Sequence, residues 1–313
     1  MPTLLDEPRM ANTQSASQRL RATMAAVRIA FTWFGVRKSL NTEQKAQAAD
    51  TFGAEGSFLS AGKKLIDTSH SAFKSVTSVR SGIQQYWRAM TVPYPEPGIR
   101  LIRRDEIQMF DIKLASLKQE MEEAVSVLDE HYADLKAAAR QRLGSLFSAS
   151  DYPATLDGLF TVAWEYPNVE PPAYLQQLSP ALFEEESRRV TARFDEAVAL
   201  AEQAFTEEFS KLVSHLTERL SGGDEGKEKI FRDSAVVNLV EFFGRFKQLN
   251  VRSNAELDSL VENAQRIVRN VKPQELRDNQ NLRQRIAGQL AGVQSQVEGL
   301  LVDKPRRNIL RRK

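Results

Sequence analysis

The sequence predicts an all-α protein, in which a helical body carries a long antiparallel helical hairpin, coiled-coil-like, with an aromatic and proline-rich tip. Two observations lead to this fold class. Two long amphipathic segments of similar length, near residues 105–147 and 180–220, flank a short insert rich in helix breakers. In addition, no stretch of the chain shows the sustained period-2 alternation that is typical of strands.

The same observations divide the chain into four parts. A flexible N-terminus covers residues 1–18, and a basic helical body covers 19–104 together with 224–302. The acidic hairpin covers 105–223, with its tip insert at 148–179, and a basic tail covers 303–313. The N-terminus is expected to be poorly ordered because it is polar and contains early prolines.

Charge is segregated along the chain although the net charge is only +2. Residues 1–104 hold 15 Lys and Arg against 7 Asp and Glu, and residues 224–313 hold 18 against 12. Residues 105–180 hold 5 against 13, and residues 181–223 hold 5 against 9. An acidic hairpin is therefore expected between basic flanks, which is a statement about partners and solubility.

The N-terminal part of the body predicts two helices and an extended connector. The first helix covers 16–38, and its apolar stripe consists of Leu20, Met24, Val27, Phe31 and Phe34. The second covers 68–90, after a glycine-rich loop region. Three prolines within 91–98 remove amide donors and restrict φ, so this segment is expected to be extended and to lead into 99–104.

The first arm of the hairpin follows a heptad repeat. Asp105 can cap its start, with Gln108 three residues further on. The positions of one face then step by three and four residues, as in a coiled coil. These positions are Ile107, Phe110, Leu114, Leu117, Met121, Ala124, Leu128, His131, Leu135 and Ala138.

The second arm follows a different repeat, of eleven residues. Ser179 is the predicted cap and Pro180 the first helical residue, and Gly222 and Gly223 end the helix. A period of about 3.67 residues favours a straight course, so the arms are expected to mesh over part of their length only. The apolar rows are Val190, Ala201 and Leu212; Phe194, Phe205 and Leu216; and Val198, Phe209 and Leu220.

The C-terminal part of the body also predicts helices. Residues 227–249 are apolar on most sides, so this helix is expected at the buried centre of the body. A capping box at 253–256 opens a helix to about residue 271, and Pro273 starts another.

Composition and motifs exclude several classes of protein. The absence of cysteine excludes disulfides, thiolate metal sites and cysteine nucleophiles. No apolar run approaches the roughly 18 residues that span a bilayer, and the N-terminus lacks the apolar core of a secretory signal. We therefore expect a cytoplasmic protein that does not contact a membrane.

No catalytic or metal-binding pattern is present. P-loop, G-x-S-x-G and H-E-x-x-H motifs are absent. In the predicted hairpin His131 and His215 lie about 28 Å apart at 1.5 Å per residue, which excludes a shared metal, and His70 is not placed beside either. The clustered glutamates at 120–123 and 184–186 suit helix surfaces. We expect no enzyme, no cofactor and no metal.

The aromatic tip insert has two interpretations. Its aromatic side chains can form a small core that covers the end of the hairpin, or they can form a recognition surface, because exposed aromatics are common interface anchors. The candidate partner-binding residues are Tyr152, Trp164, Tyr166 and Tyr174.

Clustered arginines at the hairpin base and in the tail also have two interpretations. They can be solvated, with the tail lying along the acidic hairpin, or they can contact a nucleic-acid backbone. The candidate nucleic-acid contacts are Arg100, Arg103, Arg104, Arg306, Arg307, Arg311 and Arg312.

The first half of the chain resembles a known family. The resemblance rests on Phe31-Thr-Trp-Phe-Gly-Val-Arg-Lys38, Gly62-Lys-Lys-Leu-Ile-Asp67 and a proline-bearing lead-in to a long acidic helix. In this order the segments resemble an uncharacterised family of all-helical phage and bacterial proteins, often encoded near MoxR-type AAA ATPases and von Willebrand A-domain proteins. The resemblance covers about 150 residues and implies an accessory protein of a larger assembly, such as an ATPase-containing or phage-defence assembly.

The expected function is therefore that of a non-enzymatic, elongated helical adaptor or scaffold that binds protein partners through its hairpin and tip. The alternative is a nucleic-acid-associated protein that uses the basic body and the tail. The partner and the oligomeric state stay open.

Overall fold

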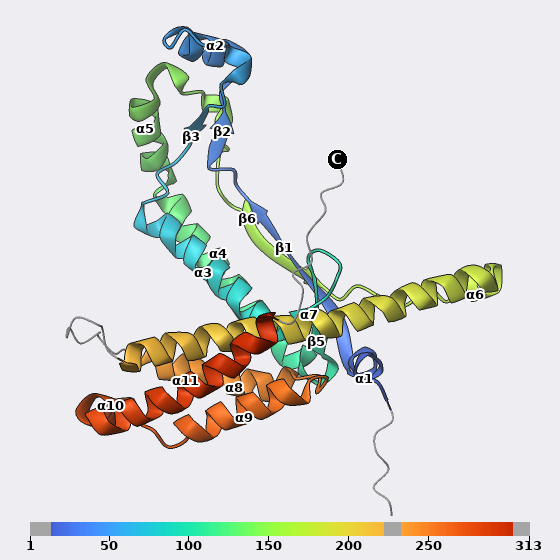
Figure 1. The fold of residues 1–313 in the computed structure, drawn as a ribbon. Helices are drawn as coiled ribbons and strands as arrows, with labels where there is room; N and C mark the ends of the chain where they lie inside the picture. Colours follow the sequence, from blue (N-terminus) through green and yellow to red (C-terminus); the bar gives the residue numbers. More distant parts are fainter. Residues whose placement is uncertain (1–13, 222–232, 303–313) are drawn as a thin grey trace, which may run out of the picture. The chain divides into compact units, whose positions relative to one another are not determined.

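The computed structural model describes residues 14–221 and 233–302 of the chain. It is mostly helical but contains two sheets, so the all-α prediction is wrong (Figure 1). One sheet has the strand order β4 (Thr91–Pro93), β5 (Ile99–Arg103), β1 (Met24–Trp33) and β6 (Phe160–Glu165). The other pairs β2 (Arg37–Ser39) antiparallel with β3 (Gly62–Lys64).

Helices make up most of the described chain. The α-helices are α1 (Ala16–Thr23), α2 (Thr42–Asp50), α3 (Ser71–Ala89), α4 (Ile107–Glu130), α5 (Tyr132–Leu143), α6 (Tyr174–Leu178), α7 (Pro180–Ser221), α8 (Ser234–Leu249), α9 (Ala255–Val268), α10 (Pro273–Asp278) and α11 (Gln280–Val302). Short 3-10 helices are η1 (Gly56–Phe58), η2 (Arg104–Glu106), η3 (Gly144–Leu146) and η4 (Ala149–Asp151).

The chain forms two compact units, and this division overturns the predicted hairpin. Among the described residues, unit one contains 14–26, 90–104, 167–221 and 233–302, and unit two contains Val27–Ala89 and Asp105–Tyr166. The first predicted arm therefore belongs to unit two and the second arm to unit one. The physical reason is that each apolar face has a nearer partner in its own unit: α4 packs on α3, and α7 packs on α11.

Unit one is a helical assembly built along α7. The helix runs beside α11 and also contacts α1 and α8 (Figure 1). Phe209 of α7 stacks on Phe242 of α8 at a centroid distance of 5.4 Å. The prediction that α8 is buried on most sides is only partly right, since Val237 and Val240 are 45% and 52% exposed.

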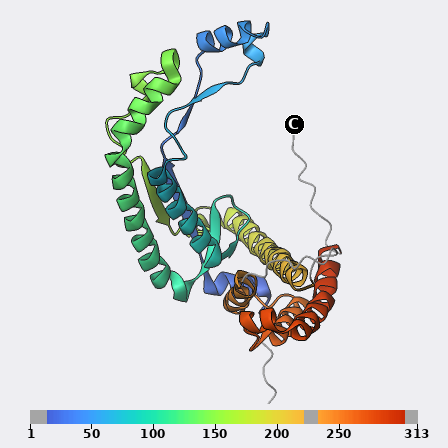
Figure 2. The same ribbon diagram turned by 90° about the vertical axis from the view of Figure 1, so that its left-hand side faces the viewer.

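Unit two is built on the pairing of α3 with α4, which Figure 2 shows side by side. The predicted heptad positions Phe110, Leu114 and Leu117 of α4 are buried. They meet α3, whose Val76 and Ile83 are fully buried. The heptad prediction is only partly right: Met121 and Leu128 are also buried, but Ile107 and Ala124 are only partly buried and His131 is exposed. The helix that covers the buried face of α4 is α3.

The predicted helix 16–38 is wrong over its second half. Only α1 is helical, with Ser15 as its cap, and residues 24–33 form β1. The residues from Val27 to Trp33 fit a helical stripe but also alternate in period 2, with Ile29 and Phe31 less exposed than their neighbours. Pairing with β6 decides between these two patterns, because a strand needs a partner that the local sequence does not show. Residues 1–13 of the predicted flexible N-terminus lie outside the described residues.

Other predicted elements are confirmed or refined. The helix over 68–90 and the second arm are confirmed as α3 and α7. The first arm divides at His131 into α4 and α5, and the connector 91–98 starts with strand β4, which pairs antiparallel with β5. The helix from Pro273 ends at Asp278, and Asn279 separates it from α11. The tail 303–313 and the glycines at 222–223 lie outside the described residues.

Within residues 14–221 and 233–302, no helix combines the length and the apolar character required to cross a bilayer. This finding agrees with the expectation from the sequence. It leaves the search for a function to the surfaces and pockets of the two units, each taken by itself.

Candidate functional site

A candidate binding surface lies in unit two, where β6 runs along α4. Strand β6 is held there by its antiparallel pairing with β1, which extends from Arg28↔Glu165 to Trp33↔Phe160. An ion pair of 3.1 Å between Arg28 and Glu165 supports one end of this ladder. We call this surface the α4–β6 face and define it by Asp111, Glu122, Asp129, Asp157, Trp164 and Tyr166.

An aromatic cluster forms one end of the α4–β6 face. The Trp164 indole Nε1 donates a hydrogen bond to Asp111 Oδ1 at 2.6 Å. Burial raises the pKa of Tyr166 to about 12, and the charge and hydrogen bond of Asp111 add to this effect. Beside it, Tyr86 of α3 stacks on Phe110 at a centroid distance of 5.4 Å. The Asp111 carboxylate therefore interacts with Trp164 of β6 and with Tyr166, which directly follows the strand.

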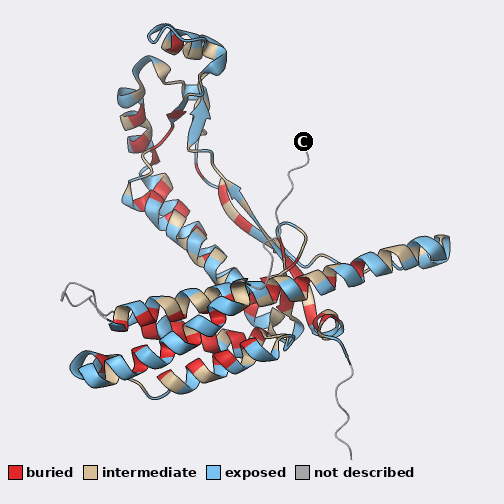
Figure 3. Ribbon diagram, viewed as in Figure 1, coloured by how far each residue is buried: buried red, intermediate tan, exposed pale blue. Residues whose placement is uncertain are grey.

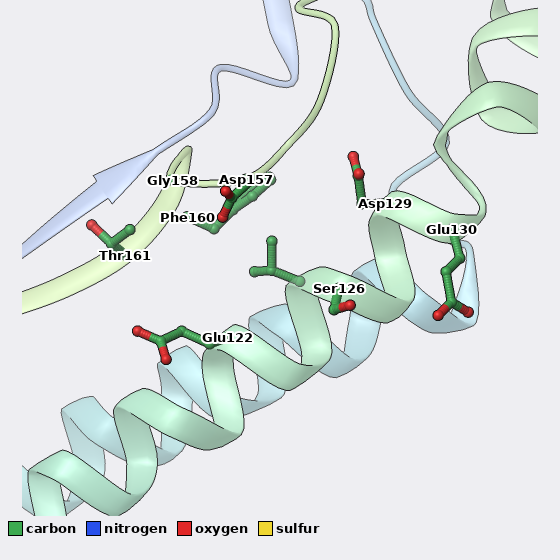
Figure 4. A pocket seen from close by; sticks show the side chains of 9 residues that line it. Glu122, Ser126, Asp129, Glu130, Asp157, Gly158, Phe160 and Thr161 are labelled. Carbon is green, nitrogen blue, oxygen red and sulfur yellow. The ribbon is translucent and has the colours of Figure 1, made fainter.

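A pocket of about 530 Å³ forms the other end of the face (Figure 4). It is lined by Glu122, Val125, Ser126, Asp129 and Glu130 from α4, and by Asp157, Gly158, Phe160 and Thr161 from the entry to β6. Val125 and Phe160 are buried and supply an apolar surface. The volume is within the range of pockets that hold small molecules or single side chains.

Asp129 sets the shape of the pocket wall. Its Oδ1 accepts the Leu156 backbone N–H at 2.7 Å, and its Oδ2 accepts the Thr155 hydroxyl at 2.9 Å. Gly158 then turns the chain into β6 with a φ of +70°, a conformation that favours glycine. Both oxygens of Asp129 are thus engaged in holding the entry to β6 against α4.

The lining of the pocket is acidic. It includes four carboxylates and no Lys or Arg. Glu122 has Lys118 at 3.9 Å, but both side chains are about half exposed, and such a pair contributes little. No ion pair within the described part of the chain neutralises Asp157 or Glu130. A cluster of negative charge beside an apolar surface favours a ligand with a cationic group.

The described residues offer no site for a metal ion made of three or more His, Asp or Glu side chains. They do contain a histidine pair that the sequence reasoning misses: the rings of His70 and His131 lie 5.1 Å apart in unit two. The predicted hairpin brings His131 into the same structure as His215, but His215 belongs to unit one. No spacing rule indicates the His70 contact, because it arises from tertiary packing at the junction of α4 and α5.

The four aromatic residues predicted to bind a partner do not share one surface. Trp164 and Tyr166 lie together on the α4–β6 face. Tyr152 is buried, and its hydroxyl donates to the Leu65 carbonyl oxygen at 2.8 Å. Tyr174 lies in unit one and is 61% exposed. The insert 148–179 is therefore not one knob, because β6 and α6 belong to different units.

The predicted arginine cluster lies within unit one and bonds to its backbone. Arg100 donates to the Thr91 hydroxyl at 2.7 Å and to the Thr91 carbonyl oxygen at 2.9 Å. Arg103 donates to a carbonyl oxygen in the last turn of α8 at 3.1 Å, and Arg104 to one at the start of β1 at 3.0 Å. Arg306, Arg307, Arg311 and Arg312 lie outside the described residues.

The pocket is not predictable from the sequence pattern. Glu122 fits a solvated helix surface, and no motif singles out Asp157. The available signal is short: Asp157-Gly158 is a turn dipeptide, and the segment after it is rich in strand-forming residues. The pocket becomes visible only when β6 is placed on α4.

Comparison with known proteins returns no match: no family model matches the chain, and no curated protein or solved structure is significantly similar to it. The resemblance to the phage and bacterial family therefore stays a prediction.

Proposed function

We propose that this protein is a non-enzymatic adaptor, and that its α4–β6 face binds a basic segment of a protein partner. The observation that carries the proposal is the pocket of about 530 Å³, which combines two buried apolar side chains with four carboxylates. An Arg or Lys side chain suits this lining, because its aliphatic stem packs on apolar surface while its cationic end pairs with carboxylates.

The aromatic end of the face supports the same class of ligand. Trp164 and Tyr166 are held by Asp111, so their rings are ordered before a partner binds. Ordered aromatic rings bind at low cost in conformational entropy, and they attract the guanidinium group of arginine through cation–π contacts. A partner segment with several basic residues would use both ends of the α4–β6 face.

The proposal includes a cytoplasmic setting and an accessory role in a larger assembly. The support for the setting is the cysteine-free composition. The support for the accessory role is the resemblance of the first half of the chain to proteins encoded beside AAA ATPases. Neither supports a particular partner, so the first experiment uses a defined basic peptide.

Calorimetric titration of the full chain with the blocked peptide (Gly-Arg)4, compared with (Gly-Glu)4, tests the proposal. We expect binding of the basic peptide only. Glu122→Gln and Asp157→Asn should each weaken it by about fivefold, which corresponds to about 1 kcal/mol for one lost ion pair.

Glu123→Gln is the matched control, because it removes the same charge from the neighbouring position of α4 without touching the pocket lining. Its affinity should stay within about twofold of the unchanged protein. Equal losses in all three variants would show a general charge effect and contradict the site. Binding of a DNA oligonucleotide that is lost on removal of residues 304–313 would support the nucleic-acid alternative instead.

A further inference from the structure

The first part of α7, in unit one, carries an uncovered surface. The first buried residue of this helix is Val190, so none of residues 180–189 is buried (Figure 3). Leu182 in this part of α7 is nevertheless 53% exposed, and Tyr174 and Leu178 of the preceding helix α6 are 61% and 76% exposed. Large apolar side chains left this exposed are common at interfaces.

One face of this region is arranged like a coiled-coil seam. Leu182, Glu185, Arg189 and Ala192 follow one another at steps of three, four and three residues, which places them on one side of the helix. Leu182, Arg189 and Ala192 are exposed, and Glu185 is half-buried. The buried residues of α7 start from Val190 and lie on another side of the helix. We call the four residues the outer α7 face.

The outer α7 face is complementary to itself. If two copies of the helix lie antiparallel with a two-fold axis beside Ser187, Glu185 of one copy faces Arg189 of the second copy. The same axis places Leu182 opposite Ala192, a large side chain opposite a small one. Every contact then occurs twice, as in any isologous interface. This symmetry of charge and size favours a second copy of the chain over an unrelated partner.

We infer that two copies of this protein associate through α7, with their outer α7 faces packed antiparallel. Leu182 packs against Ala192 of the second copy, and Glu185 forms an ion pair with Arg189 of that copy. The inference concerns unit one alone and is independent of the proposed peptide site in unit two.

Within one chain, Glu185 and Arg189 already form an ion pair, and the dimer would replace it with a pair between the two copies. Arg189 contacts Glu185 at 2.5 Å and Glu186 at 3.0 Å, and its side chain is 59% exposed. Ion pairs this exposed contribute little to stability, so replacing them by pairs between two copies costs little. The polar pair near the axis defines the register and the antiparallel direction, while Leu182 supplies the apolar contact.

Sedimentation equilibrium of the full chain, with E185R and R189E, tests this inference. The unchanged chain should form a dimer. Each variant places two like charges opposite each other and should raise the dimer Kd by at least about tenfold. A mixture of the two variants should form a heterodimer with near-normal affinity, because an all-basic face then meets an all-acidic face.

The mixture separates contacts between copies from contacts within the helix. Each variant alone lacks the Glu185–Arg189 pair inside its own chain, so recovery on mixing can arise only between chains. E184R is the matched control: it makes the same charge change at an exposed position off the outer α7 face and should leave the Kd within about twofold. A monomeric unchanged chain, or a mixture that does not recover, would overturn the inference.

Discussion

At the scale of single residues, Asp151 connects separate segments of unit two. Its carboxylate pairs with Lys38 at 2.5 Å and Lys63 at 2.6 Å, and the side chains of Asp151 and Lys63 are only 4% and 7% exposed. Lys63 also donates to the Leu146 carbonyl oxygen at 2.6 Å. The hydrogen bonds from the two lysines, the one from Lys38 first, lower the pKa of Asp151. The β2–β3 ribbon is thereby fastened to η4.

We predict that Asp151→Asn destabilises unit two by about 3 kcal/mol, because it leaves the buried charge of Lys63 without its counter-ion. Urea unfolding followed by tryptophan fluorescence measures this change. The three tryptophans, Trp33, Trp87 and Trp164, all belong to unit two, so the signal reports on that unit. Asp134→Asn, at an exposed position of α5, should change the free energy of unfolding by less than about 0.5 kcal/mol.

Comparison of the unchanged protein with Asp151→Asn also tests the sign of the pH dependence of stability. The pKa of Asp151 is lowered in the folded state, so its stabilising effect is fully present above the ordinary carboxyl pKa of about 3.9. The effect is lost as the pH falls through the lowered, folded-state value. The difference between the unchanged protein and Asp151→Asn should therefore shrink in acid. A difference independent of pH would contradict the assignment.

Tyr166 offers a second test at this scale. Its pKa of about 12 has burial as the first cause and Asp111 as the next. We predict that Asp111→Asn lowers this pKa while leaving it above the ordinary tyrosine value of about 10, because burial remains. Ultraviolet titration measures it, with Tyr166→Phe subtracted to isolate the residue. An unchanged pKa in Asp111→Asn would show that the carboxylate does not act on this hydroxyl.

At the scale of elements, the apolar face of a helix is readable from sequence, but its partner is not. Most of the predicted heptad positions of α4 are buried, although Ile107 and Ala124 are only partly so, and the helix packs on α3. In strand β1 the local pattern is ambiguous, since Val27 and Phe31 fit both a helical and a period-2 spacing. The pairing with β6 selects the strand. A local pattern records which side of an element is apolar, whereas the choice of partner depends on residues far along the chain.

A double-mutant cycle on Tyr86 and Phe110 tests the α3–α4 pairing. The rings stack at 5.4 Å, so Tyr86→Leu and Phe110→Leu should show a coupling energy of about 0.5–1.5 kcal/mol in urea unfolding. The control cycle combines Tyr86→Leu with Phe209→Leu of unit one and should show none. The hairpin predicted from sequence, in which α4 packs on α7, would give no coupling between Tyr86 and Phe110.

The candidate site was only partly predictable, because its residues come from segments that are far apart in the sequence. Trp164 and Tyr166 are aromatic residues of a proline-rich insert, and composition alone singles them out. Tyr152 has the same signal but is buried, because its hydroxyl meets the Leu65 carbonyl oxygen. The pocket carboxylates Glu122 and Asp157 come from segments 35 residues apart in the sequence, and nothing local brings them together.

At the scale of the whole molecule, the segregation of charge along the sequence does not correspond to separate acidic and basic units of the fold. The acidic segments 105–180 and 181–223 appear as one acidic hairpin in the sequence, but most of the first belongs to unit two and the second to unit one. Each unit therefore combines acidic and basic segments. Arg100, Arg103 and Arg104, which raise the basic count of the first 104 residues, donate hydrogen bonds within unit one.

Self-association predicts a stability that depends on protein concentration. A dimer formed from folded chains is favoured by mass action, so the thermal unfolding midpoint should rise when the concentration is increased about a hundredfold. Circular dichroism of the helices measures it. Leu182→Glu should remove the concentration dependence, because it takes away the apolar contact, while the midpoint at low concentration stays close to that of the unchanged protein. A midpoint that is constant with concentration in the unchanged protein would count against the dimer.

The sequence by itself determined the long helix from Pro180, most of the buried face of α4, the breaks at the prolines and the absence of disulfides, because each depends on residues that are neighbours along the chain. Only the tertiary structure decided that β1 is a strand, that α4 packs on α3, and that Glu122 and Asp157 share a pocket. Those outcomes depend on which distant apolar surfaces meet. That choice is a property of the folded chain as a whole, since a local pattern shows which face of an element is apolar but not which distant surface covers it.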